Sequence, residues 1–156
     1  MRQESTPFGV MNVATFERFF RRVANLDVDK NDLKRFNEFV SQKIYDLLVR
    51  AEAIAKANGR DVIQPYDLPI PKGLQQRIQE FTGLDEIIEM RTILEDIATR
   101  PQLDLSTSSD TDAELPRVAG GLSVALAHTF KIIDPTLKNP QTEHWERSFR
   151  LFDLLL

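Results

Sequence analysis

Two histidines and one serine motif are the residues of this sequence whose chemistry would suit catalysis or metal binding. His128 and His144 are far apart in the chain, and the carboxylates around them do not follow the spacing of a metal-binding motif. The segment GLSVA, residues 121–125, begins like the turn that presents a nucleophilic serine, but it lacks the closing glycine and a preceding strand. We interpret His128, which stands in an apolar segment, as a hydrogen-bonded core residue.

The composition excludes several further kinds of chemistry. The 156 residues include no cysteine, which excludes disulfide bonds, thiol catalysis and cysteine-based zinc sites. No apolar run approaches the roughly 20 residues of a membrane span, and the first ten residues lack the apolar stretch of a signal peptide. We therefore expect a cytoplasmic protein that is not an enzyme, does not contact a membrane, and uses no cofactor, metal or small-molecule substrate.

The remaining chemistry to consider is the binding of phosphate groups by the charged residues. The net charge is −4, and it is divided unevenly, because residues 1–83 carry +2 and residues 84–156 carry −6. Any surface that binds anions is therefore expected on the first half of the chain. A solvated helix face is the alternative, which the interleaved Asp27, Asp29 and Asp32 favour. The candidate contact residues are Arg18, Arg21, Arg22, Lys30, Lys34 and Arg35.

The elements that must position these residues are helices, since apolar residues recur at helical spacing through most of the chain. The longest predicted helix runs from Leu33 to about Asn58 without a glycine or proline, and Gly59 ends it. This periodicity predicts an all-α fold, with residues 1–10 as a mobile lead-in and 99–116 as a flexible polar loop. The other predicted helices are 14–26, 72–81, 84–98 (with Ile87, Met90, Leu94 and Ile97 inward), 117–133 and 142–155 (with Trp145, Phe149, Phe152 and Leu155 inward).

A triplet of short, long and short helices is the order of the histone fold, and in this chain a second such triplet follows the first. Residues 28–68 resemble archaeal histones, and the whole chain resembles a small bacterial family of histone-fold proteins in which one polypeptide forms its own pseudodimer. This resemblance implies a single domain, 1–156, with a first histone-fold repeat at 11–81 and a second, diverged repeat at 84–156. The residues that carry the likeness are Ala55, Lys56, Ala57, Gly59, Arg60 and Asp67.

The resemblance implies specific roles for four residues. Arg60 is expected to pair with Asp67 and so to lock the second loop onto the third helix, because a bidentate arginine–carboxylate pair is rigid. An incidental loop salt bridge is the alternative. Gly120 and Gly121 cost the helix 117–133 roughly 1 kcal/mol each relative to alanine. A close crossing of the two long helices at mid-length would compensate for that cost, and a helix break is the alternative.

The same resemblance argues against histone-like DNA binding. Archaeal histones carry a basic residue where this chain has Asp27, and a lysine–threonine pair where it has Asp61 and Val62. Carboxylates at the positions nearest phosphate replace attraction by repulsion. We therefore expect a non-enzymatic binding or scaffold protein that associates with an unknown protein partner or with itself. The alternative is a divergent nucleoid-associated protein that binds DNA weakly through its basic residues.

Overall fold

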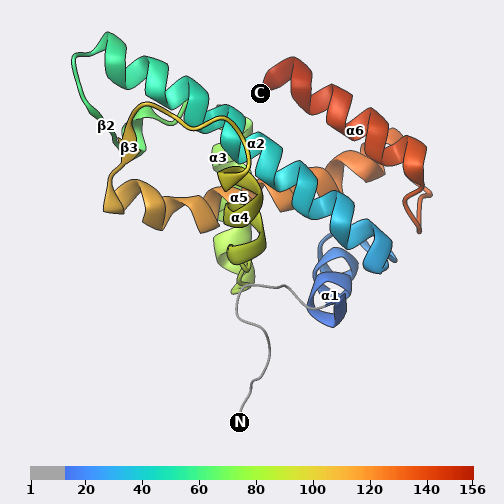
Figure 1. Ribbon diagram of the computed structural model, residues 1–156. Coiled ribbons are helices and arrows are strands. Elements are labelled where there is room, and N and C mark those ends of the chain that lie inside the picture. Colours follow the sequence, from blue (N-terminus) through green and yellow to red (C-terminus); the bar gives the residue numbers. More distant parts are fainter. Residues whose placement is uncertain (1–12) are drawn as a thin grey trace.

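Six α-helices, in two successive triplets of short, long and short, make up most of the chain in a computed structural model that describes residues 13–156 (Figure 1). The all-α prediction is therefore confirmed at the level of a mainly helical chain. The predicted lead-in, 1–10, and the first residues of the predicted repeat 11–81 lie outside the described residues. The helices are α1 (Val13–Ala24), α2 (Lys30–Ala57), α3 (Lys72–Leu84), α4 (Arg91–Ala98), α5 (Ser109–Ile133) and α6 (Thr142–Leu155).

Helix α2 begins three residues before the predicted Leu33, because Asp29 caps it. The Asp29 side chain accepts hydrogen bonds from the backbone N–H groups of Asn31 and Asp32, and the Asp32 side chain accepts one from the backbone N–H of Asp29. This reciprocal arrangement satisfies donors that a helix N-terminus otherwise leaves free. Gly59 follows the helix with a φ of 74°, a conformation that glycine adopts without steric cost.

Two predicted boundaries in the second triplet are wrong. Helix α5 starts at Ser109 and not at residue 117, so the polar segment 99–116 is not one loop. Ser108 caps the helix by accepting from the backbone N–H of Thr111, and Pro116 is accommodated inside it. Helix α4 starts at Arg91 and not at 84, because Asp85 has a left-handed φ of 56° that ends α3. The exposed Ile87 and Leu94 accordingly do not face the core, where Ile93 is buried instead.

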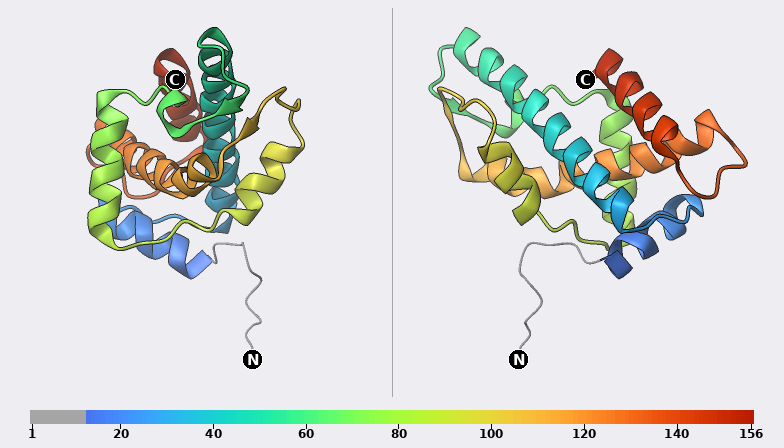
Figure 2. Two further views of the ribbon diagram at one scale, coloured as in Figure 1. Left: turned by 90° about the vertical axis from the view of Figure 1, so that its left-hand side faces the viewer. Right: turned by 45° about the vertical axis from the view of Figure 1, so that its right-hand side comes forward.

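The two triplets interlock, since each long helix packs against helices of the other triplet. Helix α3 packs on α5, helix α4 packs on α2, and α2 and α5 contact each other. Figure 2 shows α5 almost end-on, with α3 and α2 on opposite sides of it. The shared core is aromatic and aliphatic, and Trp145 of α6 stacks edge-on against Phe130 of α5 with ring centroids 4.9 Å apart. None of the helices within 13–156 is both long and apolar enough to cross a membrane.

Gly120 and Gly121 lie at a close crossing of α5 with α3, whereas the prediction placed them at the crossing of α5 with the other long helix. Both face α3 and not α2. A Cβ at Gly121 would stand 3.0 Å from the backbone nitrogen of Ile78, and a Cβ at Gly120 would overlap the ring of Phe81. The missing side chains therefore let α3 approach the backbone of α5, and the helix continues unbroken through both glycines.

The loops of the two triplets pair at both ends of the molecule. Strand β2 (Val62–Ile63) runs parallel to β3 (Ser106–Thr107), with Val62 opposite Ser106 and Ile63 opposite Thr107. A short 3-10 helix, η1 (Pro65–Asp67), follows β2. At the other end, the backbone N–H of Asp27 donates to the carbonyl of Lys138 over 2.6 Å. The loop between the first two helices of each triplet is thus tied to the loop after the long helix of the other triplet.

Candidate functional site

The predicted basic cluster does not form one open surface, because two of its arginines hold the linker between the triplets. Arg22 Nη1 lies 2.9 Å from Glu86 Oε2 and donates to the Leu84 carbonyl over 2.9 Å. Arg18 Nη2 lies 3.3 Å from the other Glu86 oxygen. The Glu86 side chain is only 9% exposed. Arg18 and Arg22 therefore join α1 to the segment that connects α3 with α4.

Of the other four basic residues, Arg21 lies in the last turn of α1, and Lys30, Lys34 and Arg35 lie at the start of α2. Arg21 is 3.5 Å from Asp27, and Arg35 donates to the hydroxyl of Thr142 over 2.8 Å. Lys30 and Lys34 are exposed and make no hydrogen bond or ion pair with a described residue. Two free lysines, an arginine bonded to a hydroxyl and an arginine near a carboxylate are therefore what remains of the predicted phosphate-binding cluster.

Arg60 and Asp67 form an ion pair across the loop that contains β2. The Asp67 side chain is completely buried, and its second oxygen accepts from the backbone N–H of Gln64 over 2.8 Å. The Arg60 guanidinium lies 5.0 Å from the ring of Tyr66, which covers it. Because a buried carboxylate requires a cation or several donors, Arg60 compensates the charge of Asp67 and fixes the turn of η1.

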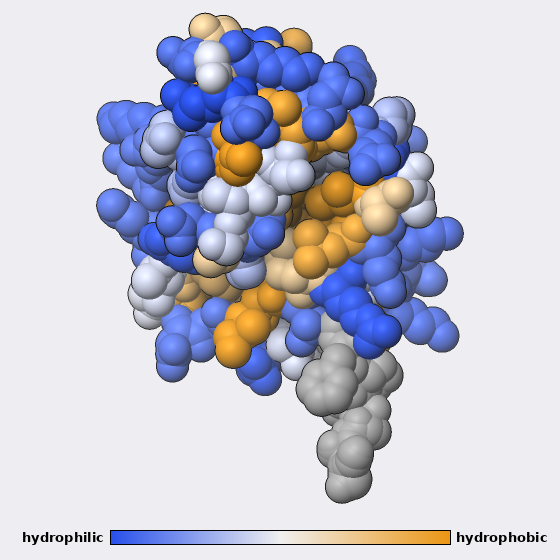
Figure 3. All heavy atoms as spheres, turned by 60° about the vertical axis from the view of Figure 1, so that its left-hand side comes forward, coloured by the Kyte–Doolittle hydropathy of each residue, from blue (hydrophilic) through white to orange (hydrophobic). Residues whose placement is uncertain are grey.

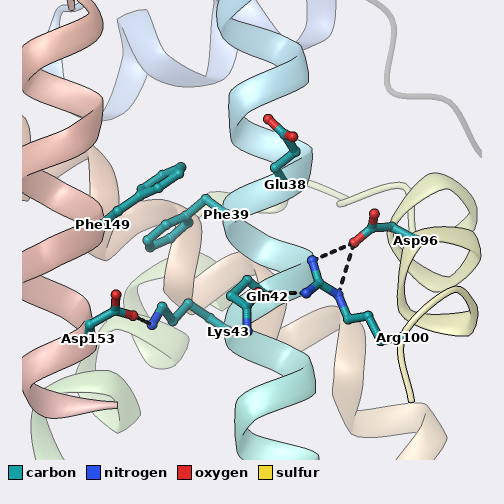
Figure 4. Close-up of a pocket in the computed structure, with 8 residues that line it drawn as sticks. All are labelled: Glu38, Phe39, Gln42, Lys43, Asp96, Arg100, Phe149 and Asp153. Carbon is teal, nitrogen blue, oxygen red and sulfur yellow. Dashed lines mark hydrogen bonds and ion pairs between the residues drawn. The ribbon is translucent and has the colours of Figure 1, made fainter. Parts of the chain in front are cut away.

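A charged recess of about 430 Å³ lies where α2 runs between α6 and α4 (Figure 4). On the α6 side, the buried Lys43 pairs with Asp153 and lies 3.4 Å from Asp46. Phe39 and Phe149 stack beside this pair with ring centroids 5.3 Å apart. The lysine therefore links two helices through residues that are 110 positions apart in the sequence.

On the α4 side of this recess, Arg100 makes the corresponding link. Its Nη2 lies 2.9 Å from Asp96, and its Nη1 donates to the side-chain oxygen of Gln42 over 2.6 Å. The hydroxyl of Tyr45 donates to the carbonyl of Pro101 over 2.6 Å. Glu38, at the edge of the recess, points away from both pairs (Figure 4). Lys43 and Arg100 thus both have carboxylate partners, and the recess is lined by an ion pair that joins α2 to α6 and a hydrogen bond that joins α2 to the end of α4.

A second recess, which we call the apolar groove, has a volume of about 710 Å³ and lies between the start of α3 and the ends of α5 and α6. Leu154, Leu155 and Ile132 on its walls are 80%, 81% and 79% exposed. The prediction that Leu155 closes the core is therefore wrong, because the last turn of α6 extends beyond the helices that cover its earlier turns. The residues that define the apolar groove are Pro71, Leu74, Ile132, Leu151, Leu154 and Leu155.

His128 lies at the rim of the apolar groove and not in the core. Its Nε2 is 2.7 Å from Glu80 Oε2 on α3, and its side chain is 36% exposed. The prediction of a buried histidine is wrong because position 128 faces the edge of the α3–α5 contact, whereas the predicted hydrogen bond is present. His144 is buried, and its Nδ1 accepts from the backbone N–H of Gln141 over 2.9 Å, which caps α6.

One buried carboxylate has a shifted pKa. Asp32 is 5% exposed, and burial raises the pKa of its carboxyl above the ordinary value, against the lowering effect of hydrogen bonds from Asp29 and Trp145. At the surface, the hydrogen bond between Lys56 and Asp104 raises the pKa of the lysine and lowers that of the aspartate. Residues 13–156 contain no cluster of histidines and carboxylates that could hold a metal ion.

Sequence reasoning missed both recesses. Lys43 stands in a run that reads as the solvated side of a long helix, and its carboxylate partner is 110 positions away. The apolar groove did leave a signal, since LFDLLL at 151–156 contains more apolar residues than one helix face can bury. These features define a mainly helical protein of two interlocked triplets whose charged site residues chiefly join one helix to another.

The chain belongs to the family described as a domain of unknown function, DUF1931, whose model matches residues 16–153. It is similar to two Aquifex aeolicus proteins, both described as uncharacterized. One is 28% identical over 115 residues, which are 74% of this chain and 67% of the relative. The other is 33% identical over 73 residues, which are 46% and 44% of the respective chains.

Two solved structures share the fold. A crystal structure of a protein from Thermus thermophilus is 55% identical, with a TM-score of 0.87 over 94% of this chain and 99% of that chain. A crystal structure of an Aquifex aeolicus protein is 24% identical, with a TM-score of 0.80 over 99% of this chain and 100% of that chain. The second likeness concerns the fold alone.

Proposed function

We infer that this chain is a single-chain pseudodimer of two histone-like repeats that works as a non-enzymatic binding module for a protein partner. The histone-like part of this proposal is supported by the order of the helices, by the contact of α2 with α5, and by the pairing of loops at both ends. The Arg60–Asp67 ion pair, which the resemblance to archaeal histones implies, supports it as well.

The observation that carries the binding role is the apolar groove. Single exposed apolar residues are common on protein surfaces, whereas contiguous apolar patches mark interaction sites. Figure 3 shows one face of the molecule, on which hydrophobic side chains adjoin one another in several places among hydrophilic ones. At the groove, Ile132, Leu151, Leu154 and Leu155 are exposed around one recess. A protein surface with apolar side chains would remove them from water.

DNA binding through Lys30 and Lys34 is the second candidate function. These lysines stand at the start of α2 next to the paired loops, free of carboxylate partners among the described residues. DNA that wraps around the molecule would also contact the paired loops at the opposite end. Exposed aspartates surround β2 and β3 there, which argues against such wrapping. These are Asp61, Asp104, Asp110 and Asp112.

Photo-crosslinking in cells that produce the protein tests the binding role. A photoreactive amino acid in place of Leu154 should give a discrete adduct, because that side chain would lie in the interface. The matched control is the same replacement at Ile87, which is 79% exposed in the linker and remote in sequence from the groove residues. Adducts of equal yield at both positions, or none at position 154, would contradict a binding role for the groove.

A gel-shift titration tests the second candidate. Binding through two free lysines should weaken steeply as the salt concentration rises and should be lost in Lys30→Glu/Lys34→Glu. Lys72→Glu, a charge change at the start of α3, is the control. The absence of a shift at low salt would remove the DNA-binding candidate and leave the protein-binding proposal unaffected.

A further inference from the structure

We propose that the partner of the apolar groove is a second copy of this chain, related to the first by a two-fold axis. The proposal rests on the function inferred above and names the partner of that same surface. It follows from four properties of the groove: the two apolar faces of α6, the amount of apolar surface, the shape of the patch, and the charge at its rim.

Helix α6 has more apolar residues than its contacts within the chain can cover. Trp145 and Phe149 face the core, where they contact Phe130 and Phe39. Leu151, Leu154 and Leu155 follow the helical spacing i, i+3 and i+4 on a face where they are 43%, 80% and 81% exposed. A helix that is apolar on opposite faces requires cover on both sides. The second side of α6 is therefore an unfilled helix-packing surface.

The apolar surface has the size that a stable interface requires at its centre. Each exposed Leu or Ile side chain offers on the order of 100 Å² of apolar surface. The four exposed residues of the groove therefore provide roughly 350 Å² on each copy, before its floor is counted. A standard interface buries about 800 Å² per partner, of which somewhat more than half is apolar. The groove thus supplies most of the apolar centre of such an interface.

The shape of the patch suits a copy of itself. Ile132, Leu154 and Leu155 are largely exposed at a recess that the buried Leu74 also lines, so the exposed side chains and the hollow belong to one surface. In a two-fold contact, the same surface patch of each copy forms the interface. If one residue of the first copy contacts a second residue of the other copy, the reverse contact is made as well. The leucines of one α6 can therefore enter the recess of the other copy in both directions.

The rim charges also favour an identical partner over a highly charged one. Arg77 lies 3.1 Å from Glu80, and the second Glu80 oxygen is hydrogen-bonded to His128. The described wall residues of the groove include no aspartate or glutamate. Near a two-fold axis like residues come close together, and a block of like charge would repel its own copy. A rim whose arginine is already paired with a carboxylate avoids that repulsion.

Sedimentation equilibrium of the purified full chain tests this proposal. The expected mass is twice 17.9 kDa at high concentration, with dissociation to 17.9 kDa on dilution. Leu154→Glu/Leu155→Glu should weaken dimerisation at least tenfold, because it places carboxylates in the interface. The control Ile87→Glu should leave dimerisation unchanged. Both substituted leucines are exposed, and circular dichroism of each variant verifies that the fold is retained.

The outcomes separate this proposal from the function on which it rests. A chain that stays at 17.9 kDa at every concentration overturns the self-association proposal. So does a dimer that Leu154→Glu/Leu155→Glu leaves intact. If the crosslink from position 154 in cells then gives an adduct with a different protein, the binding module stands and its partner is another chain. An adduct of twice the mass of the chain supports the second copy.

Discussion

The indole Nε1 of Trp145 donates a hydrogen bond of 2.9 Å to Oδ1 of Asp32, and this bond joins the last helix to the first turn of α2. The two residues are 113 positions apart, so the contact exists only when both triplets are folded together. The same carboxylate also accepts from the backbone N–H of Asp29 over 3.0 Å. A single buried carboxylate therefore serves both as a helix cap and as a link between the two halves of the chain.

Replacement of this carboxylate should reveal its raised pKa in the pH dependence of stability. Because burial raises the pKa of Asp32 above 3.8 in the folded state, the folded protein binds this proton more tightly than the unfolded chain does. Ionisation of Asp32 therefore lowers the free energy of unfolding as pH rises through the interval between 3.8 and the folded-state pKa. Each unit of elevation corresponds to about 1.4 kcal/mol.

The measurement is urea unfolding of the protein and of Asp32→Asn across a pH series from below 3.8 to neutral. The variant keeps one acceptor oxygen and loses one of the two bonds from Asp29 and Trp145, which gives a constant offset between the two proteins. On top of that offset, the stability of the wild type relative to Asp32→Asn should fall as pH rises. A difference that is independent of pH, or that grows with pH, would be incompatible with the raised pKa.

The Arg60–Asp67 pair predicts a large loss of stability when only the cation is removed. Arg60→Ala leaves the fully buried carboxylate of Asp67 with the Gln64 N–H as its remaining donor, and should cost about 3 kcal/mol. Lys56→Ala is the control, because it breaks an exposed pair with Asp104 that contributes little to stability. Chemical denaturation measures the free energy of unfolding of both variants. Equal losses in the two variants would contradict the role assigned to Arg60.

Replacement by alanine should have opposite effects on stability at two helical glycines. Gly121→Ala places a Cβ 3.0 Å from the backbone of Ile78, so α3 must move away, and the expected cost is about 2 kcal/mol. Gly83→Ala in α3 meets no atom within 4 Å and should stabilise the protein by up to about 1 kcal/mol. Thermal unfolding distinguishes them. A neutral or stabilising Gly121→Ala would mean that α3 and α5 are not in close contact there.

Replacement of the buried Lys43 should cost less free energy of unfolding than replacement of its partner Asp153. Lys43→Met keeps the length of the side chain and removes the buried charge, so its effect on the free energy of unfolding should stay within about 1 kcal/mol. Asp153→Ala leaves the lysine in the recess with only Asp46 at 3.4 Å, and should cost about 2 kcal/mol. Urea unfolding compares the two variants, and the reverse order would contradict the described ion pair.

The parts of the fold that sequence reasoning could predict are those set by local pattern. Apolar spacing located α1, α2, α3 and α6, because periodicity within one helix decides which face is buried. The start of α5 was missed because the polar composition of 99–116 favours a loop, whereas Ser108 caps a helix within that segment. The end of α6 was misassigned because Leu155 follows the helical spacing but has no neighbouring helix to cover it.

The candidate site was harder to predict for a different reason. Arg18 and Arg22 form a basic stripe on α1, but their partner Glu86 comes from a linker that sequence periodicity treated as part of a helix. Lys43 is buried only because Asp153 reaches it from α6. Such roles depend on contacts between distant segments, and a single sequence does not reveal which distant segments meet.

Separation of the two triplets tests the central claim, that they complete one core together and that neither is stable alone. Polypeptides 1–87 and 88–156 should each show little cooperative helical structure by circular dichroism, because α3 and α4 lose the long helices on which they pack. An equimolar mixture should recover the helical signal and the unfolding transition of the intact chain. Native-like, cooperative unfolding of either polypeptide by itself would contradict the claim.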